Sequence, residues 1–374
     1  MKAIAFCKKH AVLLIAAIAA ILSMFWVPPN VEYLDYLDVP VLILLFCLMA
    51  VVAGLRKLGV FQQIAGICCK HVKTARKLAF LMLHLCFFLS MLVTNDVALI
   101  TLVPLTCSIF EQTNQQKSLM RIVVIEAAAA NLGSMATPIG NPQNLYLYHY
   151  YHFSAGTFFQ TILSIVLVSY ILLLFSLLLV PNLPLQTASL PDTSAFSFLS
   201  TQKKPLILYL LLAVFCLVTV GGWVTHSVCL CVVLLGVLLT DRKLLLCVDW
   251  ELLLTFVCFF LFSGNLQHIE TIRHAMTYFL SGNVCLTSAI VSQVISNVPA
   301  AVLLSGFTEQ GRALLLGVNI GGLGTPIASL ASLIAYQYYA KSKLARNGQY
   351  MLFFLGYQFI GLFLLLAVQN LLFH

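Results

Sequence analysis

Charged residues are scarce in this chain. Asp, Glu, Lys and Arg make up 9% of the 374 residues, whereas 61% are hydrophobic, a balance that excludes an ordinary soluble protein. The apolar segments are long and continuous, and they do not alternate with polar residues as the strands of a membrane barrel would. The sequence therefore predicts an all-α polytopic membrane protein.

The sequence also lacks the short motifs of enzymes and ATP-driven pumps. It contains no HExxH zinc motif, no GxSxG motif with a suitable partner set, and no phosphate-binding P-loop. Most of the 12 cysteines lie in or beside apolar runs, where cysteine packs as a small hydrophobe. We therefore expect no enzyme, no cofactor and no bound metal other than sodium, and we expect gradients to drive any transport.

Two apolar segments are interrupted by polar residues, glycines and prolines. The first interruption, NLGSMATPIGNPQN at 131–144, separates apolar runs that are shorter than the roughly 20 residues needed to cross hydrocarbon. The second, NIGGLGTPIAS at 319–329, repeats the Asn, the first Gly and the Thr-Pro-Ile of the first. Irregular backbone at membrane depth is tolerated where it lines a cavity or is buried in protein. We expect two broken transmembrane helices, 119–153 and 312–339, whose centres face a site.

A second polar cluster precedes each interruption. TNDVA at 94–98 and SNVPA at 296–300 each lie between apolar arms of about 9 to 16 residues, which are too short to cross singly. Each pair of arms therefore predicts a re-entrant hairpin, 78–110 in the first half and 283–307 in the second. An acidic residue followed by an apolar helix also occurs in both halves and is a third matched feature. Three matched features in the same order indicate an internal repeat.

The basic residues predict how the chain crosses the membrane. We expect about nine full crossings plus the two hairpins. With a cytoplasmic N-terminus, this arrangement places all of the 20 Lys and Arg except Arg273 and Arg312 on the cytoplasmic side, so the net charge of +8 reflects topology and not a nucleic-acid partner. The C-terminus then lies outside, and the hairpins enter from opposite sides. The predicted parts are an N-terminal repeat (1–180), a linker with a connecting helix (181–226) and an inverted C-terminal repeat (227–374).

These motifs resemble the ion transporter superfamily of arsenite permeases, citrate transporters, sodium/proton antiporters and divalent anion:sodium symporters. The resemblance covers nearly the whole chain and is closest to bacterial anion permeases with a citrate-transporter-like domain. It implies an inverted-repeat fold with a scaffold part and a transport part, a homodimer formed through the scaffold helices, and an elevator-like movement. In the sodium-coupled dicarboxylate branch both tips read Ser-Asn-Thr. Here Thr94-Asn95 and Ser296-Asn297 fit, but Asp96 and Val298 depart, which weakens the case for a dicarboxylate and is closer to the arsenite permeases.

The tips and interruptions present helix N-termini, whose free N–H groups and positive dipole ends suit an anion. No arginine lies in an apolar core to bind a carboxylate through both of its amino groups. A small anion would therefore be held by dipoles and amides, and the alternative is that the transported species is uncharged or cationic. The predicted substrate ligands are Thr94, Asn95, Thr137, Asn141, Ser296, Asn297, Thr325 and Ser329. Helix capping explains Thr137 and Thr325 equally well.

The coupling ion needs different ligands. A carboxylate at mid-membrane is costly unless it has a partner, so Asp96 is the expected carrier of a proton or sodium ion. Glu126 is explained equally by a second proton site and by a structural hydrogen bond. Carbonyls at the ends of the first half-helices also suit a cation. The other coupling candidates are Asn131, Ser134, Asn319 and Gly322.

Together these features predict a secondary active transporter that moves a small anion, a carboxylate or an inorganic oxyanion, across the inner membrane. A proton or sodium gradient would drive it, and its partners would be the ion and the lipid bilayer. Arsenite-type efflux and sodium/proton antiport are alternatives within the same class. A passive channel and a membrane-embedded enzyme are alternatives of a different class.

Overall fold

The computed structural model describes residues 10–69, 72–113, 115–185 and 202–373. Among these residues the regular structure is helical, apart from one antiparallel bridge between Thr74 and Pro184. The expected all-α polytopic class is confirmed. Residues 186–201 of the predicted linker and the first nine residues of the N-terminal repeat lie outside the described residues.

Six described helices are long and apolar enough to cross a membrane, or seven if the bent pair Glu270–Ser281 and Val284–Ile295 is one span. Five of the six coincide with predicted crossings. These five are α3 (Val39–Lys57), α9 (Ala155–Ser176), α11 (Lys203–Val220), α13 (Trp250–His268) and α19 (Asn347–Phe373). The predicted total of about nine also counts the shorter helices α2 (Ala11–Ser23) and α12 (His226–Asp241) and the two broken helices. That total stays a prediction.

The first hairpin consists of α5 (Ala75–Val93) and α6 (Asn95–Thr113), which are separated only by Thr94. Each arm has 19 residues, and α5 is the sixth candidate span. The predicted arm length was therefore wrong for this half. The helices extend past the apolar run into polar turns, because Thr74 caps α5 and α6 continues to Thr113.

The second hairpin has short arms, as expected. Helix α15 (Val284–Ile295) has 12 residues and α16 (Asn297–Ser305) has nine. Only Ser296 separates them. The hairpin is preceded by the short helix α14 (Glu270–Ser281), and α4 (Val60–Cys69) precedes the first hairpin in the same way.

Both predicted helix interruptions are present. Helix α7 (Gln116–Ser134) ends before residues 135–141, and α8 (Pro142–Tyr150) follows. In the second half α17 (Gly311–Ile320) ends before residues 321–329, and α18 (Leu330–Lys341) follows. Helix α8 restarts at Pro142 because the Asn141 side chain accepts a hydrogen bond from the Asn144 N–H at 2.9 Å, which makes Asn141 its N-cap.

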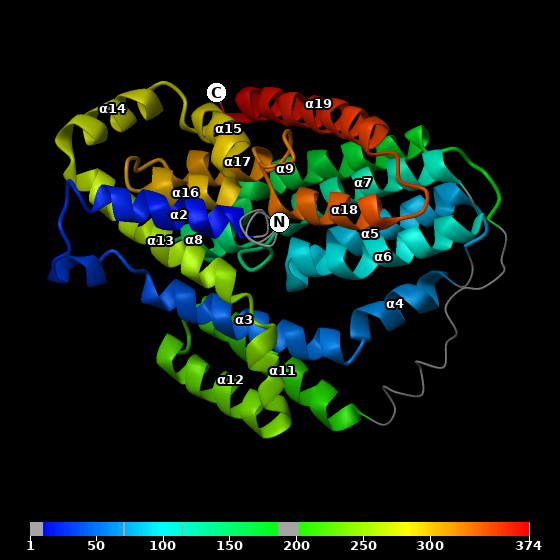
Figure 1. The fold of residues 1–374 in the computed structure, drawn as a ribbon, viewed down its shortest axis with the longest axis horizontal. Coiled ribbons are helices and arrows are strands. Elements are labelled where there is room, and N and C mark those ends of the chain that lie inside the picture. The colour runs from blue at the N-terminus through cyan, green and yellow to red at the C-terminus, as the bar shows by residue number, and fades with distance from the viewer. Residues whose placement is uncertain (1–9, 70–71, 114, 186–201, 374) are drawn as a thin grey trace, which may run out of the picture.

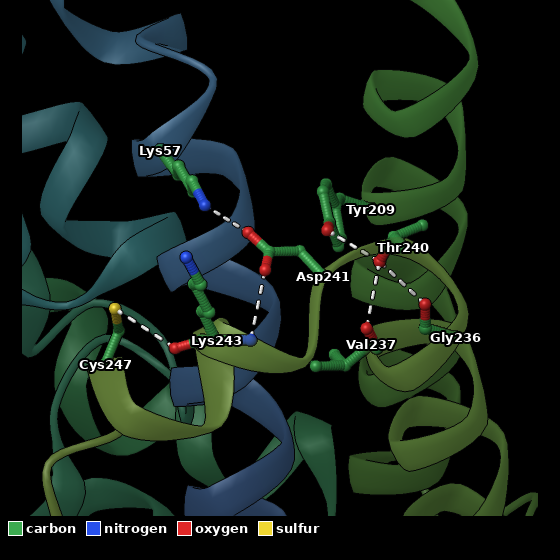
Figure 2. Close-up of polar contacts among 8 residues, drawn as sticks. All are labelled: Lys57, Tyr209, Gly236, Val237, Thr240, Asp241, Lys243 and Cys247. Atoms are coloured by element: carbon green, nitrogen blue, oxygen red, sulfur yellow. Dashed lines mark hydrogen bonds and ion pairs between the residues drawn. The ribbon is translucent and has the colours of Figure 1, made fainter.

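Helices α3, α11 and α12 form a layer beside the hairpins and broken helices (Figure 1). Contacts between these three helices hold the layer together at one end, as Figure 2 shows. Lys57 at the end of α3 forms an ion pair with Asp241 at the end of α12. The Tyr209 hydroxyl of α11 lies 2.8 Å from the Thr240 hydroxyl of α12. The short 3-10 helix η4 (Arg242–Cys247) follows directly after α12.

In each half the first hairpin arm packs closely on the first part of the broken helix, and a glycine permits the approach. A Cβ atom at Gly133 of α7 would lie 2.7 Å from Phe87 Cα and 2.7 Å from Ser90 Oγ of α5. A Cβ atom at Gly321 would lie 2.8 Å from Ala289 Cα and 2.9 Å from Ser292 Cβ of α15. The contacted residues lie seven and four positions before each hairpin tip, so the two halves pack in the same way.

We predict that Gly133→Ala and Gly321→Ala each destabilise the protein by roughly 1–3 kcal/mol, because the added methyl group overpacks a tight helix contact. Gly356→Ala in α19 is the matched control, since nothing lies within 4 Å of a Cβ there. Thermal unfolding of the purified protein in detergent, followed by circular dichroism, measures the difference. Equal melting temperatures for all three variants would contradict the prediction.

Candidate functional site

The two hairpin tips share an unusual backbone conformation. Thr94 has a φ of 88° and Ser296 a φ of 75°, and His152 is the only other described non-glycine residue with positive φ. The conformation follows from the geometry, because a single residue must reverse the chain between two helices. Backbone strain of this kind persists where the surrounding structure enforces it, and it is typical of functional sites.

The threonine of each Thr-Pro-Ile triplet ties the interruption to the hairpin of its own half. Thr137 Oγ1 donates to the Met91 carbonyl at 2.6 Å, and Thr325 Oγ1 donates to the Gln293 carbonyl at 2.9 Å. Met91 and Gln293 each lie three residues before the strained tip. Neither threonine caps a helix, since α8 starts at Pro142 and α18 at Leu330. The two threonines therefore position the tips.

The two interruptions also bind each other, through a reciprocal pair of hydrogen bonds. Asn141 Nδ2 of the first half donates to Asn319 Oδ1 of the second at 3.1 Å. Ser329 Oγ of the second half donates to Asn131 Oδ1 of the first, also at 3.1 Å. Asn131 and Asn319 are equivalent in the repeat, as are Asn141 and Ser329. All four side chains are buried.

The tip asparagines reach the same centre. Asn95 Nδ2 lies 3.5 Å from Asn131 Oδ1, and Asn131 Nδ2 donates to the Gly322 carbonyl at 2.6 Å. A Cβ atom at Gly322 would lie 2.9 Å from Asn297 Nδ2, so the glycine lets the second tip approach. The Asn297 N–H also donates to the Ala328 carbonyl at 2.9 Å. Residues from both tips and both interruptions thus surround one buried point.

Ser134 joins this network at its first-half edge. Its hydroxyl accepts a bond from Asn141 Nδ2 at 3.2 Å and donates to the Asn131 carbonyl at 2.9 Å. The Ser296 hydroxyl lies further out and donates to the Ala328 carbonyl at 3.3 Å.

Two further residues support the irregular segments, and the sequence reasoning did not select them. Asn144 donates to the Met135 and Thr137 carbonyls at 3.1 and 3.0 Å and accepts from Asn319 Nδ2 at 2.7 Å. Gln293 donates to the Gly321 and Leu323 carbonyls at 2.8 and 3.0 Å. A usable signal existed for Gln293, because it is a polar residue in an apolar arm three positions before a tip.

The two predicted carboxylates stand apart from the amide network. Asp96 lies in the first turn of α6, where its N–H donates to Asn95 Oδ1 at 3.0 Å, while its Oδ1 atom is buried without a hydrogen-bond partner. Glu126 lies on α7, five residues before Asn131, and is fully buried. Its Oε1 atom accepts from Thr106 Oγ1 at 2.5 Å, whereas Oε2 has no partner. Neither carboxylate occurs in an ion pair among the described residues.

This arrangement can bind a small ion without a fixed opposite charge. Buried amides and hydroxyls offer both donors and acceptors, and paired broken helices occur in polytopic membrane transporters. The chain belongs to the citrate transporter family, whose family model matches residues 3–309. The match includes both hairpins and the first broken helix.

Similar proteins agree with this assignment. The chain is 34% identical to the uncharacterized transporter MJ0456 of Methanocaldococcus jannaschii over 293 residues, which are 78% of each chain. It is 30% identical to the inner membrane protein YbiR of Escherichia coli over 304 residues, 80% of this chain and 79% of that one. A shorter match, 32% identity over 109 residues, or 29% of this chain and 22% of the other, is to the silicon efflux transporter LSI3 of Oryza sativa. The chain is therefore a membrane transporter and not an enzyme.

We predict that the Asn141–Asn319 contact couples the two halves energetically. The double variant Asn141→Ala/Asn319→Ala will change the free energy of unfolding by an amount that differs from the sum of the two single changes by roughly 0.5–3 kcal/mol, because the residues are in direct contact. Unfolding by denaturant in mixed micelles measures the free energies. Asn265, buried in a separate contact with Ser23 and Tyr33, provides the control. Asn141→Ala combined with Asn265→Ala will be additive, and additivity in both pairs would refute the coupling.

Proposed function

We propose that this protein is a secondary active transporter that moves a small anion, a carboxylate or an inorganic oxyanion, across the inner membrane. The observation that carries the proposal is the convergence of both strained tips and both interruptions on one buried set of amides, through the Asn141–Asn319 and Ser329–Asn131 bonds. An ion bound at this point touches both halves of the molecule. A change in the contact between the two halves would therefore change from which side of the membrane the bound ion can be reached.

An anion suits this point because four helices begin around it. Helices α6 and α16 begin at the tips, and α8 and α18 begin just after the interruptions, so each contributes a positive dipole end. No Lys or Arg side chain is hydrogen-bonded to the candidate ligands among the described residues. The proposed substrate ligands are Thr94, Asn95, Thr137, Asn141, Ser296, Asn297, Thr325 and Ser329.

Asp96 is the proposed coupling group. It follows the first tip directly, and its buried, unpartnered Oδ1 can accept a proton or bind sodium. The equivalent position in the second half is Val298, so only one half offers a carboxylate beside its tip. Oxygen atoms at Asn131, Ser134, Asn319 and Gly322 complete the candidate cation ligands, and the protein needs no other cofactor.

The proposed movement is elevator-like. The layer of α3, α11 and α12 would be the scaffold, also joining two copies in a homodimer, and the hairpins and broken helices would move against it. The Asp38 carboxylate at the start of α3 lies 2.9 Å from His149 Nδ1 at the end of α8, so the two parts contact each other through polar groups that can separate. The dimer and the movement rest on the family resemblance.

The proposed orientation places the N-terminus in the cytoplasm and the C-terminus outside. Helix ends assigned to one side also meet in space. His149 lies near His226, with ring centroids 5.5 Å apart, on the side assigned to the outside. The Lys343 N–H donates to Glu111 at 2.8 Å on the side assigned to the cytoplasm. These contacts support the assignment of the helix ends to two common sides. The distribution of the basic residues indicates which of the two sides is cytoplasmic.

We predict that a cysteine at Trp223, in the exposed turn between α11 and α12, reacts with a membrane-impermeant thiol reagent added to intact cells. A cysteine at Lys343 will react only after the membrane is opened. Both variants are made in a background without native cysteines, because Cys68 and Cys231 are exposed. The reverse labelling pattern would overturn the orientation.

Efflux of an inorganic species is the second candidate. The partial match to a silicon efflux transporter and the Asp96 carboxylate beside the first tip favour it over uptake of a dicarboxylate. Sodium/proton antiport is the third, because it needs only the carboxylate and the cation ligands.

Transport into proteoliposomes tests the proposal, with an imposed proton or sodium gradient and a panel of citrate, succinate, sulfate, phosphate and arsenite. We expect one anion to be taken up. Asn95→Ala and Asn297→Ala will each lower its uptake about tenfold or more, since losing a buried hydrogen bond to the bound anion costs roughly 1–3 kcal/mol. Asn347→Ala, an exposed asparagine, is the control. Uptake that survives both tip substitutions would place the substrate elsewhere.

The same preparation assigns the coupling ion. Asp96→Asn will abolish gradient-driven uptake while leaving exchange without a gradient measurable, and Asp35→Asn, an exposed carboxylate, will change neither. Sodium/proton exchange without any anion flux, lost in Asp96→Asn, would replace the anion proposal by antiport.

A further inference from the structure

Buried polar atoms without hydrogen-bond partners gather along the first half of α7. Of ten such side-chain atoms among the described residues, four belong to α7 or to its N-cap residue: Gln115 Oε1, Ser118 Oγ, Arg121 Nε and Glu126 Oε2. Each unpartnered buried group costs free energy unless water or an ion satisfies it. These groups begin at the N-terminal end of α7 and extend inward to Glu126. The broken helix thus has a polar approach on a side that the hairpin tips do not use.

Glu126 is the innermost member of this series. Its side chain has no exposed surface, and only one of its oxygens is hydrogen-bonded, to Thr106 of α6. Two further groups are within electrostatic reach of Glu126: the Tyr350 hydroxyl of α19, which is also buried without a partner, and the Cys107 thiol of α6. A charged carboxylate here would face these neutral groups with half of its hydrogen-bonding capacity unused.

No cation among the described residues forms an ion pair with Glu126. The thiols of Cys69 on α4 and Cys86 on α5 are also within electrostatic reach of Glu126, and both are neutral when protonated. Arg121, the nearest basic residue along α7, directs its guanidinium to the Leu179 carbonyl. A neutral, protonated carboxyl group fits this environment better than a carboxylate.

The repeat shows that the fold does not require a carboxyl group at this position. Asn131 and Asn319 are equivalent, which aligns Glu126 with Leu314 of α17. Leu314 is fully buried in the same place on its own half-helix. An apolar side chain therefore satisfies the packing, and the carboxyl group in the first half has another role.

We propose that Glu126 is a proton-binding site, separate from the hairpin tips, and that water reaches it along Ser118 from the N-terminal end of α7. A hydronium ion transfers its proton to Glu126 Oε2, which leaves a neutral carboxylic acid and a water molecule, and the reverse step releases the proton. Thr106 keeps the other oxygen in place, and Tyr350 supplies a hydroxyl to the arriving water. This inference rests on the proposed function only where the proton bound by Glu126 takes part in transport, because proton binding itself needs no substrate.

Infrared spectroscopy of the full-length protein in lipid nanodiscs tests proton binding directly. On acidification we expect a carbonyl stretching band of a buried carboxylic acid, which shifts on exchange into D₂O. The band will be lost in Glu126→Gln and retained in Asp96→Asn and in the exposed control Glu270→Gln. If Glu126→Gln fails to fold, Glu126→Asp will move the band instead. A band unchanged in both Glu126 variants would overturn the proposal.

The rate of deuterium exchange at this band tests the water route. Ser118→Leu fills the approach with an apolar side chain, so the exchange will slow while the band remains. Ser164→Leu makes the same change on the exposed face of α9 and will leave the rate unchanged. Equal rates in the two variants would refute entry along Ser118.

Transport measurements then separate this inference from the proposed function. If the band behaves as expected and no anion is transported, Glu126 binds protons and the anion proposal fails. If anion uptake occurs but no band depends on Glu126, the anion proposal stands and this inference fails.

Discussion

Hydrocarbon provides no hydrogen-bond partner, so the polar groups that this chain places inside the membrane must be satisfied by the protein or by water and ions that it binds. The constraint is severe where α7 and α17 stop, because each helix end leaves carbonyls and N–H groups unpaired. The amide side chains of Asn131, Asn144 and Gln293 bind several of these carbonyls. The interruptions persist because buried amides replace the missing helical bonds.

That solution also joins the halves. Asn131 binds a carbonyl of the second interruption, and Asn319 binds Asn141 and Asn144 of the first, so neither segment is satisfied by its own half alone. A site built in this way responds to any relative movement of the two halves, because such movement breaks the hydrogen bonds of the amides that join them. The strained residues Thr94 and Ser296 lie at the edge of this network, where strain is held by packing on both sides.

The two halves agree in packing and differ in charge. Glycines at equivalent positions admit the hairpin arms, and the triplet threonines bind equivalent carbonyls. Asp96 and Glu126 lie in the first half, and the equivalent positions of the second half hold Val298 and Leu314. Packing therefore explains the features that the two halves share. Ion or proton binding gives a reason for the carboxyl groups that only the first half has at these positions.

The sequence by itself determined the class, the helix interruptions, the hairpin tips and the family, because these follow from apolar run lengths, from Gly and Pro, and from a motif that occurs twice. It did not determine the length of α5 and α6, since capped polar turns extend a helix beyond its apolar run. It also did not reveal that Ser329 would bind Asn131, or that Asn144 would bind Asn319. Those contacts join residues 198 and 175 positions apart, and only tertiary packing brings such distant amides within hydrogen-bond range.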